Sequence, residues 1–168
     1  MENIAVFNVT VNLNAEQSWE KLRDFSTAHH YVPSIDTCEI RSEKKEGLTA
    51  TRRVAGKHQA LDETIIEWNE GKGFKITLHK GDKPAFPFKQ AEFTYRIDPL
   101  DDKTSKMTTT LVYDLGMGIF GKILGALFLK GLIQNNIRDV ALSLQNYYNT
   151  GQPTTDEDLK RIKKEMGI

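Results

Sequence analysis

The sequence has a single cysteine, no excess of either charge and no long apolar run, and each shortage excludes a class of protein. Cys38 alone cannot form a disulfide within the chain, which is typical of proteins from reducing compartments. The 23 basic residues balance 23 acidic ones, so the chain lacks the basic excess with which most nucleic-acid-binding proteins contact phosphates. Lys122 and Lys130 interrupt the longest apolar stretch before it reaches about 18 residues, so we expect no membrane span.

Recognised catalytic and cofactor-binding motifs are also missing. The sequence contains no P-loop, dinucleotide fingerprint, nucleophile elbow or HExxH pattern. His29 and His30 are adjacent, and adjacent histidines seldom converge on one ion, so we expect no metal and no cofactor. The N-terminal segment has no basic region typical of a signal peptide and begins at once with a strand-like pattern. We therefore expect a cytoplasmic monomer or homodimer that does not bind nucleic acid.

The predicted elements are one strand, two short helices, six strands and one long helix. Apolar and polar residues alternate over Ile4–Leu13, which predicts a half-buried strand. Asn14 and Gln17 form a capping-box pattern for the helix that follows, and Pro33 ends a second short helix. Further strands are predicted over Asp36–Ser42, Leu48–Ala55, Ala60–Trp68, Phe74–Lys80, Phe88–Asp98 and Lys106–Leu115. Short turns between successive strands indicate an antiparallel meander.

A long helix is predicted over Gly116–Asn149, and its two halves differ in composition. From Ile133 onward, apolar residues recur every three or four positions, as in an amphipathic helix that packs on a sheet. The first half is apolar apart from Lys122 and Lys130 and contains several glycines. Each glycine weakens an isolated helix by about 1 kcal/mol relative to alanine. We interpret the first half as the lid of a cavity, so the pocket is expected beneath it.

Residues beyond Thr150 form a separate short segment. Residues 151–155 interrupt the long helix, and another helix is predicted with Thr155 as its N-cap. Acidic residues occupy its first turn and basic residues its last, as the helix dipole favours. We expect a ligand-binding domain over residues 1–150 and a helical extension over residues 151–168.

Three segments resemble the START-like, or SRPBCC, superfamily. Ala15–Phe25 is similar to the family's first helix, in which a tryptophan and a phenylalanine anchor against the sheet. Tyr31–Ile35 resembles the short segment that leads to the second strand, and the long helix ending in Tyr147 and Tyr148 completes the pattern. The resemblance covers about residues 3–149 and is closest to the bacterial polyketide cyclase/dehydrase and lipid-transport branch.

The resemblance implies an α+β protein with the helix-grip fold. In this fold a seven-stranded curved antiparallel sheet, with two short helices after strand one, is covered by one long C-terminal helix across an internal cavity. The resemblance further implies a hydrophobic small-molecule ligand, such as a lipid, quinone, sterol-like or polyketide-derived compound. We therefore expect a binding or carrier protein. A polyketide cyclase, aromatase or dehydratase using the same cavity is the alternative, so enzymatic activity remains open.

Strand alternation places a set of side chains on the inward face of the sheet. Arg52 shares a face with apolar neighbours, whereas Arg53 points outward. The parity of Ala60–Trp68 is ambiguous, and the resemblance favours an inward Glu63. The candidate ligand-binding residues are Arg52, Glu63, Phe86, Phe93, Tyr95, Leu111, Tyr113, Phe120, Leu124 and Phe128, and His58 is a further polar candidate.

Three roles remain open for Arg52 and Glu63. A buried arginine requires a carboxylate or several acceptors, so the two side chains can form an ion pair that only neutralises itself. The pair can also orient a polar group on an otherwise apolar ligand. The third role is general acid–base catalysis by Glu63 or His58, because polyketide cyclisation requires removal of a proton next to a ketone.

Two apolar segments also have alternative interpretations. Lys83–Phe88 contains two prolines and two phenylalanines, so Phe86 either packs on the sheet edge or belongs to a semi-rigid flap over the pocket. The first half of the long helix, which contains Phe120, Leu124 and Phe128, either covers the cavity or inserts at a membrane surface. Peripheral membrane contact is therefore a second interpretation of this segment.

Overall fold

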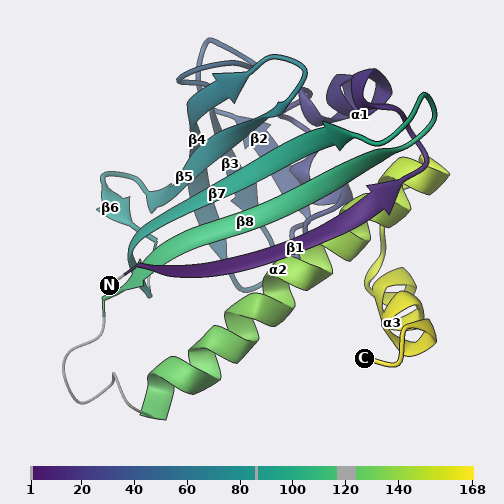
Figure 1. Cartoon of the computed structure of the whole chain (residues 1–168). Helices are drawn as coiled ribbons and strands as arrows, with labels where there is room; N and C mark the ends of the chain where they lie inside the picture. The colour runs from purple at the N-terminus through teal and green to yellow at the C-terminus, as the bar shows by residue number, and fades with distance from the viewer. Residues whose placement is uncertain (1, 86, 117–123) are drawn as a thin grey trace.

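A long helix crosses a curved antiparallel sheet in the computed structural model, which describes residues 2–85, 87–116 and 124–168, with side chains described from residue 128 onward in the last range (Figure 1). The elements in chain order are β1 (Asn3–Val11), α1 (Ala15–Leu22), the 3-10 helix η1 (Ala28–His30), β2 (Thr37–Ile40), β3 (Thr51–Ala55), β4 (Ala60–Asn69), β5 (Gly73–Lys80), β6 (Lys83–Pro84), β7 (Phe88–Pro99), β8 (Ser105–Leu115), α2 (Leu124–Thr150) and α3 (Asp156–Glu165). This is an α+β architecture in which α2 covers the sheet and α3 follows it.

The strands form one sheet in the order β1-β8-β7-β5-β4-β3-β2, and each neighbouring pair is antiparallel. The two-residue β6 pairs only with β5, and it is an addition to the seven predicted strands. Every other strand lies where it was predicted, with ends that differ by a few residues. The predicted meander is therefore confirmed, because β2 to β8 pair in chain order apart from the short β6, past which β5 pairs with β7, and β1 closes the order by pairing with β8.

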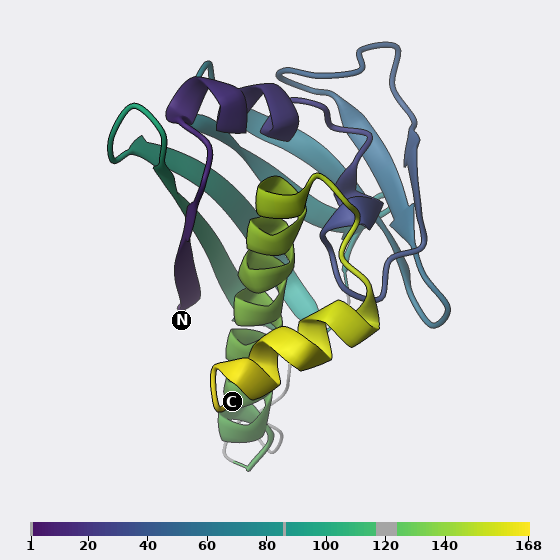
Figure 2. The ribbon, with the colours of Figure 1, turned by 90° about the vertical axis from the view of Figure 1, so that its right-hand side faces the viewer.

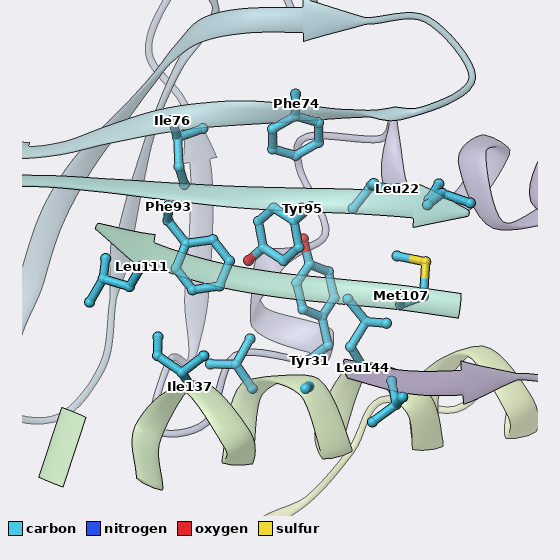
Figure 3. Packing of buried hydrophobic residues seen from close by; sticks show 14 of the residues in the cluster. Leu22, Tyr31, Phe74, Ile76, Phe93, Tyr95, Met107, Leu111, Ile137 and Leu144 are labelled. Atoms are coloured by element: carbon cyan, nitrogen blue, oxygen red, sulfur yellow. The ribbon is translucent and has the colours of Figure 1, made fainter. Parts of the chain in front are cut away.

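The core lies between the concave face of the sheet and α2. Alternate residues of β7 and β8 point into it, and several of these side chains are labelled in Figure 3. The buried residues of these two strands are Ala91, Phe93, Tyr95, Ile97, Ser105, Met107, Thr109, Leu111 and Tyr113. Period-two alternation in these strands therefore predicted the inward face correctly.

A β-bulge in β4 changes the face to which its last residues point. Ile65 pairs with Ile76, but Glu67 pairs with Lys75, so Ile66 is an extra residue in this strand. Simple alternation predicts an inward Glu67 and an outward Trp68. Glu67 is instead exposed and forms an ion pair with Lys75 at 3.2 Å, whereas Trp68 packs against the core. Period-two alternation therefore does not continue through the bulge to the end of this strand.

Helix α2 runs along the edge strand β1 and is fixed to it by amide side chains. Gln134 Nε2 donates to the Val6 carbonyl at 2.9 Å, and Gln145 Nε2 donates to the Thr10 carbonyl at 2.7 Å. The Asn12 N–H donates to Asn149 Oδ1 at 2.8 Å. These bonds satisfy backbone groups that an edge strand would otherwise expose. The helix therefore blocks the sheet edge as well as covering the core.

The described helix begins later than predicted. The sequence pattern places its start at Gly116, but the Gly116 N–H donates to the Pro87 carbonyl at 3.0 Å and so continues the pairing of β7 with β8. Helix α2 begins at Leu124 in the structure, and residues 117–123 lie outside the described part of the chain. The predicted lid glycines Gly118 and Gly121 belong to those residues.

Helix α1 is attached to the sheet by a pair of buried hydroxyl groups. Asn14 caps the helix, and the predicted capping box with Gln17 is present. The oxygen atoms of Ser18 and Ser105 lie 2.8 Å apart, and Ser105 also donates to the Leu13 carbonyl at 2.9 Å. Both serine side chains are fully buried and cannot reach water. The bonds between them and to Leu13 therefore take the place of hydrogen bonds to water.

Replacing Ser105 by alanine should lower the free energy of unfolding by about 1–3 kcal/mol, because it leaves the buried Ser18 hydroxyl without its partner. Urea unfolding followed by circular dichroism measures this loss. Ser26→Ala is a matched control, since it removes a solvent-accessible hydroxyl bonded to Asp24. Equal losses for the two variants would contradict the proposed importance of the buried pair.

Candidate ligand-binding site

Arg52 is fully buried between the sheet and the segment that follows α1. It lies directly opposite Glu63 in the β3–β4 ladder, and its Nε donates to Glu63 Oε2 at 2.5 Å. Its Nη1 donates to the Phe25 carbonyl at 2.8 Å, and the guanidinium carbon lies 4.1 Å from the centre of the Phe25 ring. The predicted ion pair is therefore present, and a backbone carbonyl and an aromatic face complete its surroundings.

Both members of the pair are held where the solvent is largely excluded. Burial by itself lowers the pKa of Arg52, but the adjacent Glu63 carboxylate more than offsets this, so the pKa lies above its ordinary value. Within the described residues, one guanidinium nitrogen, Nη2, is buried without a hydrogen-bond partner. Among the same residues, the Tyr31 hydroxyl is likewise buried without a partner, although it interacts electrostatically with Arg52. Hydrogen-bonding capacity therefore remains unused beside the ion pair.

Tyr31 and Tyr95 lie next to this pair and approach each other edge to face. Their ring centres are 6.0 Å apart, and Figure 3 shows Tyr31 extending towards Tyr95 from the opposite side of the core. Burial raises the pKa of the Tyr31 hydroxyl and raises that of Tyr95 well above its usual value. Both phenols therefore stay protonated at neutral pH, so each can donate a hydrogen bond.

A cavity of about 180 Å³, which we call the inner cavity, lies between the sheet and α2. Its lining residues come from the η1–β2 segment, five strands, the β3–β4 turn and α2. They are Val32, Ile35, Val54, Gln59, Leu61, Glu63, Leu78, Phe88, Phe93, Tyr95, Leu111, Ile133, Asn136, Ile137 and Val140. Most of these side chains are apolar, and Glu63 and Tyr95 bring polar groups to the wall. Apolar walls with a few placed polar groups are typical of small-molecule sites.

The structure brings four of the predicted site residues to this cavity. The four are Glu63, Phe93, Tyr95 and Leu111. Arg52 does not line the cavity, but it is hydrogen-bonded to Glu63, which does. Tyr113 is buried, and its ring centre lies 5.6 Å from that of Phe88, but it does not line the inner cavity. His58 is exposed between β3 and β4 and is also absent from the lining.

The described helical wall of the cavity comes from the second half of the predicted helix. Ile133, Asn136, Ile137 and Val140 form this wall, although that half was expected only to fix the helix to the sheet. Phe128 is 74% exposed and does not line the cavity. The apolar face of the amphipathic half therefore serves both as anchor and as cavity wall, and the predicted lid residues 117–127 lie outside the side chains that the structure describes.

The remaining predicted candidates lie outside the described parts of the chain. Phe86 and Phe120 belong to residues that the structure does not describe, and the Leu124 side chain is also among those not described. No helix in the described ranges is long and apolar enough to cross a membrane.

The η1–β2 segment contributes cavity residues that alternation could not predict. Val32 and Ile35 reach the cavity from an irregular segment in which Ser34 has a positive φ of 64°. A Cβ atom at Gly56 would lie 1.8 Å from the Ser34 carbonyl oxygen, so the segment can pack against the end of β3 only because residue 56 has no side chain. In the sequence, the glycine at position 56 is the feature that could have indicated the close approach of the η1–β2 segment to the end of β3.

Comparisons with known proteins agree with this architecture. Residues 5–148 match the profile of the family described as polyketide cyclase / dehydrase and lipid transport. No curated protein sequence matches the chain. Among solved structures, a protein from Thermobifida fusca is 20% identical, with a TM-score of 0.67 over 96% of this chain and 93% of its own.

Two further structures share the fold at lower identity. The ZhuI aromatase/cyclase from Streptomyces sp. R1128 is 13% identical, with a TM-score of 0.66 over 92% of this chain and 100% of its own. Ara h 8.0201 is 12% identical, with a TM-score of 0.58 over 86% of this chain and 98% of its own. At these identities the similarities establish the helix-grip fold.

Replacing Arg52 by methionine should lower the free energy of unfolding by about 3–5 kcal/mol, because Glu63 would remain as a buried charge without its partner. The double variant Arg52→Met/Glu63→Leu should recover a large part of that loss, since it removes both charges. Urea unfolding at neutral pH measures both effects.

Arg53→Met is the matched control for this experiment. Arg53 is the next residue on the opposite face, where it pairs with Asp62 at 2.8 Å and its side chain is 43% exposed. Its loss should be clearly smaller, because solvent screens exposed ion pairs. The account of the buried pair would be wrong if Arg52→Met were no more destabilising than Arg53→Met.

Proposed function

Because this chain belongs to the polyketide cyclase/dehydrase and lipid transport family, we propose that it binds and carries a hydrophobic small molecule in the inner cavity. The observation that carries this proposal is an apolar space between the sheet and α2 that has polar groups at only a few positions. Apolar walls contribute affinity by removing ligand surface from water, at about 25 cal/mol per Å². Lipids, quinones, sterol-like compounds and polyketide-derived compounds all share the required apolar surface.

The polar groups on the wall give such a ligand a preferred orientation. The Tyr95 hydroxyl stays protonated and is available to donate to an oxygen atom of the ligand. Glu63 accepts from Arg52 through one oxygen, so its second oxygen can accept from a ligand hydroxyl. In this proposal Arg52 is a positioning residue, because it holds the Glu63 carboxylate without lining the cavity.

An enzyme of the cyclase, aromatase or dehydratase type is the alternative, and one observation favours it. A protonated Tyr95 and a carboxylate from Glu63 line the same apolar cavity, and such a pair can serve as acid and base. The Glu63 carboxylate is engaged in the ion pair with Arg52, however, and His58 is exposed outside the cavity. Binding without conversion is therefore the role that the geometry supports better.

Filling the inner cavity should weaken binding of an apolar probe. Leu78 lines the cavity and is half-buried, so Leu78→Trp places a larger side chain in the space that a ligand would occupy. We expect the affinity for the fluorescent probe 1-anilinonaphthalene-8-sulfonate to fall about tenfold or more, which corresponds to about 1.4 kcal/mol. Fluorescence titration measures the change.

Leu48→Trp is the control for the cavity-filling variant. Leu48 is 52% exposed and does not line the inner cavity, so this substitution adds the same side chain elsewhere and should leave probe binding unchanged. If both variants bound the probe as tightly as the unaltered protein, the inner cavity would not be the binding site.

Native mass spectrometry of the purified protein should distinguish the carrier from the enzyme. A carrier is expected to release a bound apolar molecule, and that molecule should be recovered unchanged after incubation with fresh protein. Conversion of the molecule to a product, lost in Glu63→Gln, would instead support the enzyme. The conservative substitution keeps the size of the side chain while removing its charge and basicity.

A further inference from the structure

A second, larger space lies directly outside the inner cavity. This outer groove has a volume of about 500 Å³ and runs between the η1–β2 segment, α2 and α3, which crosses α2 in Figure 2. Val32, Gln59, Asn136 and Val140 line both spaces. The four shared residues show that the groove and the inner cavity are adjacent.

The C-terminal segment that forms one wall of the groove is firmly attached. The Thr154 N–H donates to the His30 carbonyl at 2.9 Å, and Thr154 Oγ1 donates to the Ser143 carbonyl at 2.7 Å. Leu159 of α3 is buried, and Lys163 forms an ion pair with Asp139 of α2 at 2.8 Å. This wall lies beyond residues 5–148, the part of the chain that matches the family profile.

The volumes indicate that a ligand of ordinary size occupies both spaces. Small-molecule sites in proteins usually measure about 300–1,000 Å³. At about 180 Å³ the inner cavity falls below this range, whereas the inner cavity and the outer groove of about 500 Å³ together lie within it. A ligand with its apolar end in the inner cavity would therefore place its other end in the groove.

The groove presents hydrogen-bond donors that have no partner. In the described part of the chain, the side-chain amides of Gln59 and Asn136 and the ammonium group of Lys160 have no hydrogen bond or ion pair. Asp139 is compensated by Lys163 at 2.8 Å and by Arg138 at 3.5 Å. Asp156 also lines the groove, in the first turn of α3, where the helix dipole stabilises a carboxylate. The groove therefore offers donors from Gln59, Asn136 and Lys160 beside the carboxylate of Asp156.

Building on the proposed function, we propose that the outer groove is a second compartment of the binding site, which takes the oxygen-bearing end of an amphipathic ligand. The apolar end lies in the inner cavity, and the carboxylate or hydroxyl oxygens at the other end accept hydrogen bonds from Lys160 and Asn136. Helix α3 thereby selects amphipathic ligands that are long enough to reach it. Wholly apolar or short molecules bind only through the inner cavity.

Two probes of different length test this compartment in the full-length protein. Dodecanoate is long enough to span both spaces, whereas hexanol is short enough for the inner cavity alone. Displacement of 1-anilinonaphthalene-8-sulfonate measures the affinity of each. Lys160→Ala and Asn136→Leu should each weaken dodecanoate binding about fivefold, the equivalent of one hydrogen bond. Lys160 lines only the groove, so Lys160→Ala should leave hexanol binding unchanged. Asn136 lines both spaces, so Asn136→Leu should change hexanol binding less than dodecanoate binding. Dodecanol in place of dodecanoate distinguishes a hydroxyl from a carboxylate end.

Lys164→Ala is the matched control, because Lys164 is an exposed lysine of the same helix that does not line the groove. Circular dichroism verifies that each variant is folded. Dodecanoate binding that is unchanged in both groove variants, or equal losses for dodecanoate and hexanol, would overturn the second compartment alone. If neither probe bound the unaltered protein and Leu78→Trp had no effect on the fluorescent probe, the proposed function would fail with it.

Discussion

Burying the Arg52 guanidinium against the segment after α1 imposes the strictest constraint on this fold. A full charge in this position requires a compensating carboxylate, because an unpaired charge would be prohibitively costly. Glu63 supplies one acceptor across the β3–β4 ladder, and the Phe25 carbonyl supplies another from the segment after α1. The register of two strands and the path of the chain after α1 are therefore linked through one side chain. The same constraint fixes the Glu63 carboxylate at the cavity wall.

Helix α2 carries a second set of linked requirements. Its amide side chains bond to the edge strand β1, while Ile133, Ile137 and Val140 face the sheet. These apolar residues both anchor the helix and enclose the cavity, so the position of the helix determines the cavity's size. Exposed Phe128 and Leu132 show that the apolar surface of α2 is not fully used by the sheet. Because α2 is fixed to the edge strand, it spans the concave face of the sheet, and side chains do not fill the whole space between them. The unfilled space is the inner cavity.

Much of this architecture could be predicted from the sequence because local patterns determine it. Alternation identified the inward faces of β7 and β8, and the capping box identified the start of α1. The resemblance to the START-like superfamily, confirmed by the family match and by the solved structures, supplied the arrangement of these elements. Alternation predicted an inward Arg52, whereas the resemblance favoured an inward Glu63, and the need to compensate a buried charge suggested the pair.

Other features depend on contacts between distant residues. The bulge at Ile66 reversed the end of β4, and no local pattern distinguishes a bulged strand from a regular one. The cavity was expected beneath the glycine-rich half of the helix because apolar composition was taken as a sign of a lid. Its described wall is the amphipathic half, since the position of an internal space depends on sheet curvature. Val32 and Ile35 were missed because they belong to an irregular segment positioned by Gly56.

The central claim is that an apolar ligand binds between the sheet and α2, next to the Arg52–Glu63 pair. The most direct measurement is a ¹H–¹⁵N NMR titration of the protein with dodecanoate, with backbone amides assigned. The account predicts that the largest shift changes occur at Phe93, Tyr95, Leu111 and Ile137, whose side chains line the inner cavity. Changes confined to the outward-facing residues Ile4 and Val6 of β1, with the cavity residues unaffected, would contradict it.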